Sequence, residues 1–151
     1  NGIMQKTIVA GLFVLLTASV SPQVFAQEDV IEKRQKAMKS NSADVKAIKA
    51  AVESKDYATI ETKAKDIMGT ADKIPSLFPK GSSAGKTKAT PAIWEKSDEF
   101  AKAAKNLSKA SSELASAAKS KDDAAIAAKV KAVGEACSSC HKQFRADKYS
   151  E

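Results

Sequence analysis

The most constraining feature of the sequence is residues 137–141, which read Cys-Ser-Ser-Cys-His. This short segment contains both cysteines and the only histidine of the chain. On a helix, residues three and four positions apart share a side, so both thiols and the imidazole are expected to project together. A C-x-x-C-H sequence is typical of c-type haem attachment, in which two thiols add to the haem vinyl groups and the histidine binds the iron.

Other roles of a C-x-x-C pair explain less of the pattern. A thioredoxin-like motif needs a βαβ context, and the chain has no strand pattern. A structural zinc site needs about four ligands, and the chain offers three Cys or His residues. A plain disulfide and a free dithiol stay open as alternatives, but neither explains the adjacent histidine.

The first 26 residues differ from the rest of the chain. One lysine precedes an apolar run from Ile8 to Val20, and the segment closes on Ala26. This pattern predicts a secretory signal peptide over 1–26, with 1–3 as upstream extra residues, followed by a single domain over 27–151. The apolar run is shorter than a typical membrane span, so we expect no stable membrane anchor.

An export signal and a haem-attachment sequence both indicate the periplasm. The whole chain has 25 basic and 18 acidic residues, a net charge of +7. Removal of 1–26, which contains one lysine and no acid, leaves +6 (24 minus 18). The basic residues are scattered, which excludes a nucleic-acid-binding arm and leaves two interpretations. They form either an ordinary solvated surface or a cationic face that attracts acidic redox partner proteins.

Four segments are predicted to be helices, because Ala, Lys and Glu dominate and apolar residues recur at spacings of three and four. They cover 28–52, 56–74, 91–119 and 122–148, with a longer Pro-, Gly-, Ser- and Lys-rich connection between the middle two. The residues predicted to be buried on their apolar seams include Ile48, Ile67, Phe100 and Leu114. Thr90 and Ser120 are the predicted caps of the last two helices. In the connection, Leu77 and Phe78 are interpreted either as a plug of the core or as a cover over a porphyrin edge.

A short internal repeat relates the two halves. The triplet Ser-Lys-Asp at 54–56 recurs at 120–122, each time between two predicted helices. Two antiparallel helical hairpins joined by a longer loop make a four-helix bundle. The predicted fold is therefore all-α, an antiparallel four-helix bundle with covalent haem on the C-terminal helix.

The chain resembles a known family, the class II c-type cytochromes, also called the cytochrome c′ family. Within it, the chain is most similar to the low-spin, six-coordinate members. The block from Cys137 to Arg145 is similar to the family's C-x-x-C-H-x-x-aromatic-Arg ending. Residues 34–38, Arg-Gln-Lys-Ala-Met, are similar to its R-Q-x-x-M motif. Shorter matches are "LFP" at 77–79 and "P-x-I-W" at 91–94.

The resemblance implies one covalent haem c on Cys137 and Cys140, with His141 as an axial ligand of the iron. It places Met38 over the opposite, distal face, where the family has either a ligand or an apolar blocking residue. It also implies three haem contacts, made by Arg34, Phe144 and Arg145.

Met38 is the predicted sixth ligand for reasons within the chain as well. No second histidine exists, and only Met38 and Met68 remain after residue 26. Met38 lies on the central apolar seam of its helix, whereas Met68 lies at the edge of its own seam. Thioether ligation would raise the reduction potential, as suits an electron carrier.

The sequence thus predicts a periplasmic monohaem electron carrier and not an enzyme, because no catalytic pair, phosphate loop or triad is present. The alternative is a five-coordinate cytochrome c′ that binds NO or CO at a vacant distal site. The expected partners are periplasmic redox proteins or small gaseous ligands. The resemblance also implies a possible homodimer, formed through the first two helices.

Overall fold

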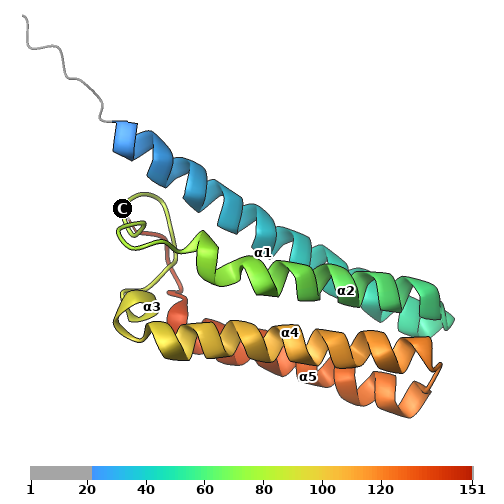
Figure 1. The fold of residues 1–151 in the computed structure, drawn as a ribbon. Coiled ribbons are helices and arrows are strands. Elements are labelled where there is room, and N and C mark those ends of the chain that lie inside the picture. The colour runs from blue at the N-terminus through green and yellow to red at the C-terminus, as the bar shows by residue number, and fades with distance from the viewer. Residues whose placement is uncertain (1–21, 151) are drawn as a thin grey trace, which may run out of the picture.

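The computed structural model describes residues 22–150, which form an antiparallel bundle of four long helices (Figure 1). The predicted fold class is confirmed. The predicted signal peptide lies mostly outside the described residues, and the first helix begins before its expected cleavage point. In chain order the elements are α1 (Pro22–Ser54), α2 (Tyr57–Lys73), the 3₁₀ helix η1 (Ile74–Leu77), α3 (Ala92–Glu95), α4 (Ser97–Lys119) and α5 (Asp123–Phe144).

Both copies of the Ser-Lys-Asp triplet form the same tight turn at one end of the bundle. Lys55 and Lys121 adopt left-handed backbone conformations, with φ of 54° and 55°. The following aspartates, Asp56 and Asp122, cap α2 and α5 by accepting hydrogen bonds from the backbone N–H groups of Thr59 and Ala125. The prediction that Ser120 caps the last helix is therefore wrong, because the carboxylate two residues later takes that position.

The third predicted helix is interrupted near its start. Lys96, with φ −121° and ψ 50°, separates the single turn of α3 from α4. The Thr90 hydroxyl, the predicted cap, has no hydrogen-bond partner. The last helix also ends earlier than predicted, because Arg145 leaves the helix in an extended conformation and its backbone pairs with Ala89.

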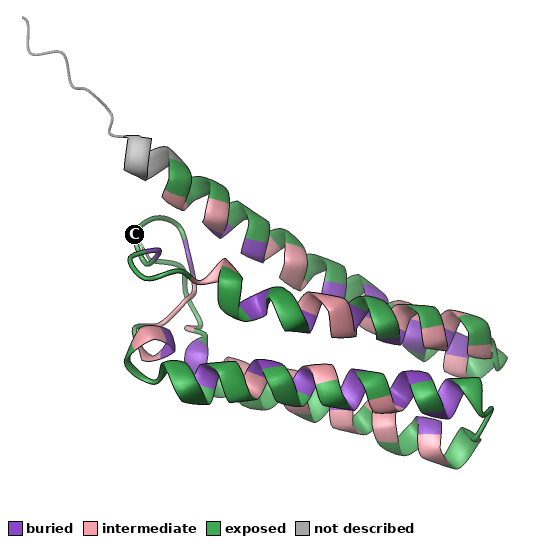
Figure 2. Ribbon diagram, in the orientation of Figure 1, coloured by how far each residue is buried: buried purple, intermediate pink, exposed green. Residues whose placement is uncertain are grey.

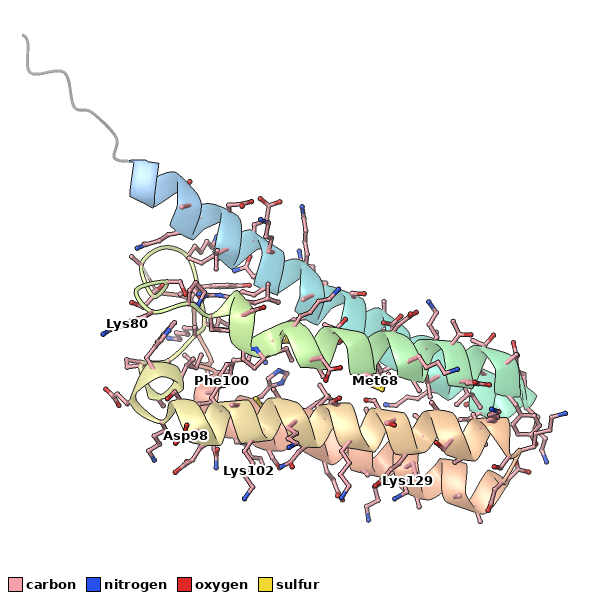
Figure 3. The ribbon with its side chains drawn as sticks, in the orientation of Figure 1. Met68, Lys80, Asp98, Phe100, Lys102 and Lys129 are labelled. Carbon is pink, nitrogen blue, oxygen red and sulfur yellow. The ribbon has the colours of Figure 1, made fainter. Side chains whose placement is uncertain are left out.

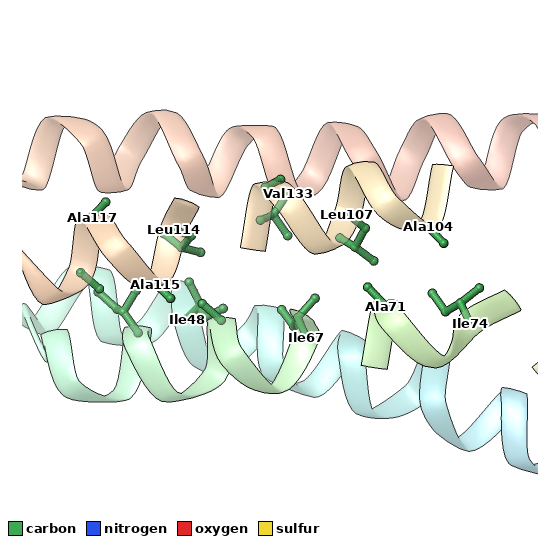
Figure 4. Packing of buried hydrophobic residues seen from close by; sticks show 14 of the residues in the cluster. Ile48, Ile67, Ala71, Ile74, Ala104, Leu107, Leu114, Ala115, Ala117 and Val133 are labelled. Atoms are coloured by element: carbon green, nitrogen blue, oxygen red, sulfur yellow. The ribbon is translucent and has the colours of Figure 1, made fainter. Parts of the chain in front are cut away.

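The core is a chain of aliphatic and small side chains along the bundle (Figures 2 and 4). The middle of it includes Ile48, Ile67 and Leu114, each almost completely buried. The most extensive packing joins α2 to α4, followed by α4 to α5 and α1 to α2, whereas α1 and α5 touch only sparsely. Within the described residues, no helix is both long and apolar enough to span a membrane.

Candidate functional site

The residues of the C-x-x-C-H segment occupy the last two turns of α5. Cys137, Cys140 and His141 are each partly buried, and the two cysteines form no disulfide. At about 100° per residue, the thiols and the imidazole spread over roughly a quarter of the helix circumference, with Cys137 between the other two. This places two nucleophilic sulfurs and one metal-binding ring on one side of one helix, as the sequence predicts.

Burial shifts the acid–base behaviour of all three groups. Desolvation raises the pKa of the Cys137 thiol, and desolvation together with the neighbouring thiol raises the pKa of Cys140 to about 11. Desolvation, aided by the positive charge of Arg145, lowers the pKa of His141. The imidazole is therefore neutral at pH 7, which is the form that binds metals.

Met38 lies on α1 at nearly the same height along the bundle as His141. The two tight turns are at the same end of the molecule (Figure 1), and helices rise 1.5 Å per residue. Met38 is 16 residues, or about 24 Å, from the turn end of α1, and His141 is 18 residues, or about 27 Å, from that of α5. Met68 (Figure 3) is only 11 residues, or about 16 Å, from the turn end of α2.

The facing sides of α1 and α5 are both apolar and both incompletely covered. On α1, Met38, Val45 and Val52 form a partly buried stripe with a spacing of seven residues. On α5, Val130 and Cys137 continue a similar stripe. The two helices touch only sparsely, and these apolar side chains are not fully buried. Together with the two thiols and the imidazole, they are residues that fit a flat apolar group such as a porphyrin.

Three aromatic rings fill the bundle end that carries the C-x-x-C-H segment. Phe100, near the start of α4 (Figure 3), contacts Phe78 edge to face with centroids 4.9 Å apart. On its other side it contacts Phe144 of α5 in the same manner, at 5.2 Å. Phe78 therefore plugs the end of the core, which was one of its two predicted roles, and Phe144 is buried three residues after His141.

Arg34 is buried in the interior one turn before Met38. Its guanidinium donates hydrogen bonds to the Ser82 hydroxyl and carbonyl, at 2.9 and 2.8 Å, and to the Thr87 hydroxyl at 2.9 Å. It also stacks over the Phe78 ring, 4.6 Å from the centroid. Arg34 thus ties α1 to the long connection, and its predicted contact with a haem edge stays a prediction.

Arg145 follows α5 and is solvent-exposed. Its backbone N–H donates to the carbonyl of His141 at 3.0 Å, so the turn that carries the histidine also fixes the exit of the chain. The predicted haem contact of its side chain likewise stays a prediction.

A groove of about 520 Å³ runs between α4 and α5 and reaches Cys140. It is lined by alanines and by polar side chains that include Glu99, Lys102 and Glu135, and neither Cys137 nor His141 borders it. The imidazole is rotated about 100° from Cys140 around the helix. The groove therefore lies beside the expected iron site and not at it.

Several contributors to this end of the molecule are absent from the sequence-based site. Ser82 and Thr87 are buried partners of Arg34, yet they belong to a loop without periodicity, 48 and 53 residues away in the chain. Phe100 was predicted only as a core residue. The one available signal was the arginine itself, because a charged residue on an apolar seam needs polar partners there.

Comparison with known proteins decides the family. The family model of cytochrome c′ matches residues 29–145, which include both Met38 and the C-x-x-C-H segment. The chain belongs to the cytochrome c′ family. Proteins of this family carry one covalently bound haem c, so the predicted cofactor is confirmed.

Individual relatives agree over nearly the whole chain. The cytochrome c′ of Rhodospirillum rubrum is 37% identical over 95% of this chain and 100% of its own length. Cytochrome c-556 of Agrobacterium fabrum is 36% identical over 95% of this chain and 97% of its own. Among solved structures, a cytochrome c′ with a ligand-controlled dimer dissociation superposes with a TM-score of 0.75 at 28% identity, covering 80% of this chain and 97% of that one.

Proposed function

We propose that the chain is a periplasmic monohaem cytochrome c′ that binds a small gaseous ligand, NO or CO, at the distal face of its haem. The observation that carries the proposal is the family match over 29–145, which spans both sides of the expected iron site, from Met38 to His141. A solved relative whose dimer responds to a ligand supports the same assignment. The gas-binding function, which was the alternative at the sequence level, is therefore proposed ahead of the electron carrier that the sequence favoured.

Each residue of the site has a specific part in this proposal. Cys137 and Cys140 anchor the haem through thioether bonds, and His141 offers its neutral imidazole to the proximal side. When bound, haem supplies an iron that changes oxidation state and accepts diatomic ligands. We place the ligand beside Met38, between α1 and α5, which touch only sparsely. Arg34, Phe144 and Arg145 are proposed to contact the haem edge, and no residue is assigned a catalytic role.

The titration of the reduced protein with CO and NO under anaerobic conditions tests this function. We expect saturable changes in the Soret band of the wild-type protein, with Met38→Ala binding CO at least as tightly. Met68→Ala is the matched control, because the same count of residues places Met68 about 8 Å nearer the turn end than Met38 and about 10 Å nearer than His141. The proposal would be contradicted if the wild-type protein did not bind CO while the Met38→Ala variant did.

That contradicting result would instead support the second candidate, an electron carrier with Met38 as the sixth ligand. The observation in favour of it is the near-equal height of Met38 and His141 along the bundle. In either case, acidic redox proteins are the proposed electron-transfer partners, and a homodimer is the proposed assembly.

Export is part of the same proposal. The segment 1–26 is proposed to be a signal peptide, removed after Ala26 as the protein reaches the periplasm. N-terminal sequencing of the exported protein should then begin at Gln27. An N-terminus upstream of residue 22 would show that the leader is retained.

A further inference from the structure

Asn41 is a buried polar residue on the same stripe of α1 as Arg34 and Ile48, at intervals of seven. It is only 7% exposed, and its side-chain oxygen has no hydrogen-bond partner. An unpaired amide in an apolar interior lowers stability, so its presence needs a reason. Arg34 obtains its partners from the long connection, whereas Asn41 has no comparable partner for this oxygen.

The position of Asn41 points to the distal face. It lies three residues after Met38, so the two side chains are neighbours on one face of α1. Helical side chains lean toward the N-terminus and cover the preceding turn, which for Asn41 is the turn of Met38. By its count of 13 residues from the turn end of α1, Asn41 lies about 20 Å along the bundle, level with Cys137 at about 21 Å.

The other buried polar atoms without hydrogen-bond partners do not lie next to Met38 on α1. Asp44 has Lys63 within 3.4 Å of its other carboxylate oxygen. Thr90 belongs to the loop before α3. Ser111 is eight residues, or about 12 Å, from the turn end of α4 and can turn its hydroxyl toward its own helix backbone.

We propose that Asn41 is a distal hydrogen-bond donor, whose amide N–H stabilises the outer oxygen of a diatomic ligand bound beside Met38. Rotation of the amide exchanges its oxygen and nitrogen, so the same position presents either an acceptor or a donor. The inference rests on the proposed gas-binding function and assigns it a specificity-determining residue. A hydrogen bond in a dry pocket favours ligands that accumulate negative charge on their outer atom.

The test compares the reduced CO complexes of the wild type, Asn41→Leu and Asn41→Gln. Infrared spectra with ¹²CO and ¹³CO should show a higher C–O stretching frequency in Asn41→Leu, because loss of the donor reduces electron transfer onto CO. CO should also dissociate about fivefold faster from this variant, the factor expected for one net hydrogen bond. Asn41→Gln, which keeps the amide, should restore part of the wild-type frequency.

Two controls separate this role from a structural one. Ser111→Ala removes another unpaired buried group far from the distal face and should change neither the frequency nor the rate. Asn41→Leu should melt at or above the wild-type temperature, because it removes an unpaired polar group. An unchanged C–O frequency in Asn41→Leu, an equal shift in Ser111→Ala, or a lower melting temperature of Asn41→Leu would each overturn the proposal.

The same comparison is made in a Met38→Ala background, where the distal side is open whether or not Met38 ligates the iron. Suppose that the wild type binds no CO, but the C–O stretching frequency of the Met38→Ala protein still changes when Asn41 is replaced. The proposed gas-binding function then fails, and the position of Asn41 at the distal face stands. If both backgrounds bind CO and neither responds to Asn41, the gas-binding function stands and the inference fails.

Discussion

The two ends of the bundle are built on different principles. At the turn end, two copies of one short motif close two hairpins with the same backbone geometry and the same aspartate cap. The opposite end contains a long connection, three aromatic rings and a buried arginine, together with the C-x-x-C-H segment of α5. Local sequence accounts for the backbone of both turns, which exposed contacts of Asp123 with Lys55 and Tyr57 also join. The second end depends on buried contacts between distant segments.

Replacement of both cysteines, Cys137→Ser with Cys140→Ser, should have the largest effect. Haem should no longer remain with the polypeptide through denaturing electrophoresis or acid–acetone extraction, because the thioether bonds are lost. The site end should also lose helical order, since ligand bound only to the native state adds to its stability. A double variant that keeps covalent haem, or circular dichroism that shows an unchanged thermal midpoint, would contradict this account.

Phe100→Ala should destabilise the protein by about 3–5 kcal/mol, the usual cost of removing a buried aromatic ring. It should also alter the haem absorption bands, because Phe100 bridges Phe78 and Phe144. The matched control is Leu114→Ala in the middle of the core, which should cost about 2–5 kcal/mol without a change in the bands. Chemical denaturation and absorption spectra of both variants check this, and equal spectral changes would show that the two regions are coupled.

Arg34→Ala should destabilise the site end by about 2–4 kcal/mol, because it leaves three buried acceptors without a charged donor. Arg34→Lys should recover little of this, since one ammonium group cannot reproduce the forked contacts to Ser82 and Thr87. Gln35→Ala is the control: its exposed amide donates to the carbonyl of Lys86 in the same connection. Urea denaturation should give Gln35→Ala a cost below about 0.5 kcal/mol, and a similar cost for both residues would remove the special role of Arg34.

The smallest effects are expected at the turn end. Lys55→Gly and Lys121→Gly should each stabilise the protein by up to about 1 kcal/mol, because glycine tolerates the left-handed conformation better than lysine does. Lys55 also forms an exposed ion pair with Asp123 beside the other turn, at 2.9 Å, so the gain in Lys55→Gly should be smaller than the gain in Lys121→Gly. Thermal unfolding measures the stability of each variant. A lower melting temperature in either variant would contradict the prediction.

The same contrast explains how far the sequence alone could predict the molecule. The periodic seams correctly placed Ile48, Ile67 and Leu114 in the core, because burial of one helix face dictates the spacing of its apolar residues. The break at Lys96 and the cap at Asp122 were missed, because helix ends depend on one or two local hydrogen bonds that several neighbouring residues can make.

The candidate site divides in the same way. The C-x-x-C-H segment carries its chemistry in consecutive residues, so its helix and its shared face were predictable. The partners of Arg34 were not, because they come from an aperiodic loop. Ligation of the iron by Met38 depends on the separation of α1 and α5. That separation is set by the packing of both helices, and no spacing in the sequence encodes it.

The coordination state of the iron shows directly whether the distal face is free to bind a gas. The measurement is the absorption spectrum of the purified protein, without added ligand, in the oxidised and reduced states at neutral pH. The account predicts high-spin spectra in both states, with His141 as the only protein ligand and the distal face free for a gas. Low-spin spectra in both states, lost in Met38→Ala, would contradict it and make the protein a His/Met-ligated electron carrier.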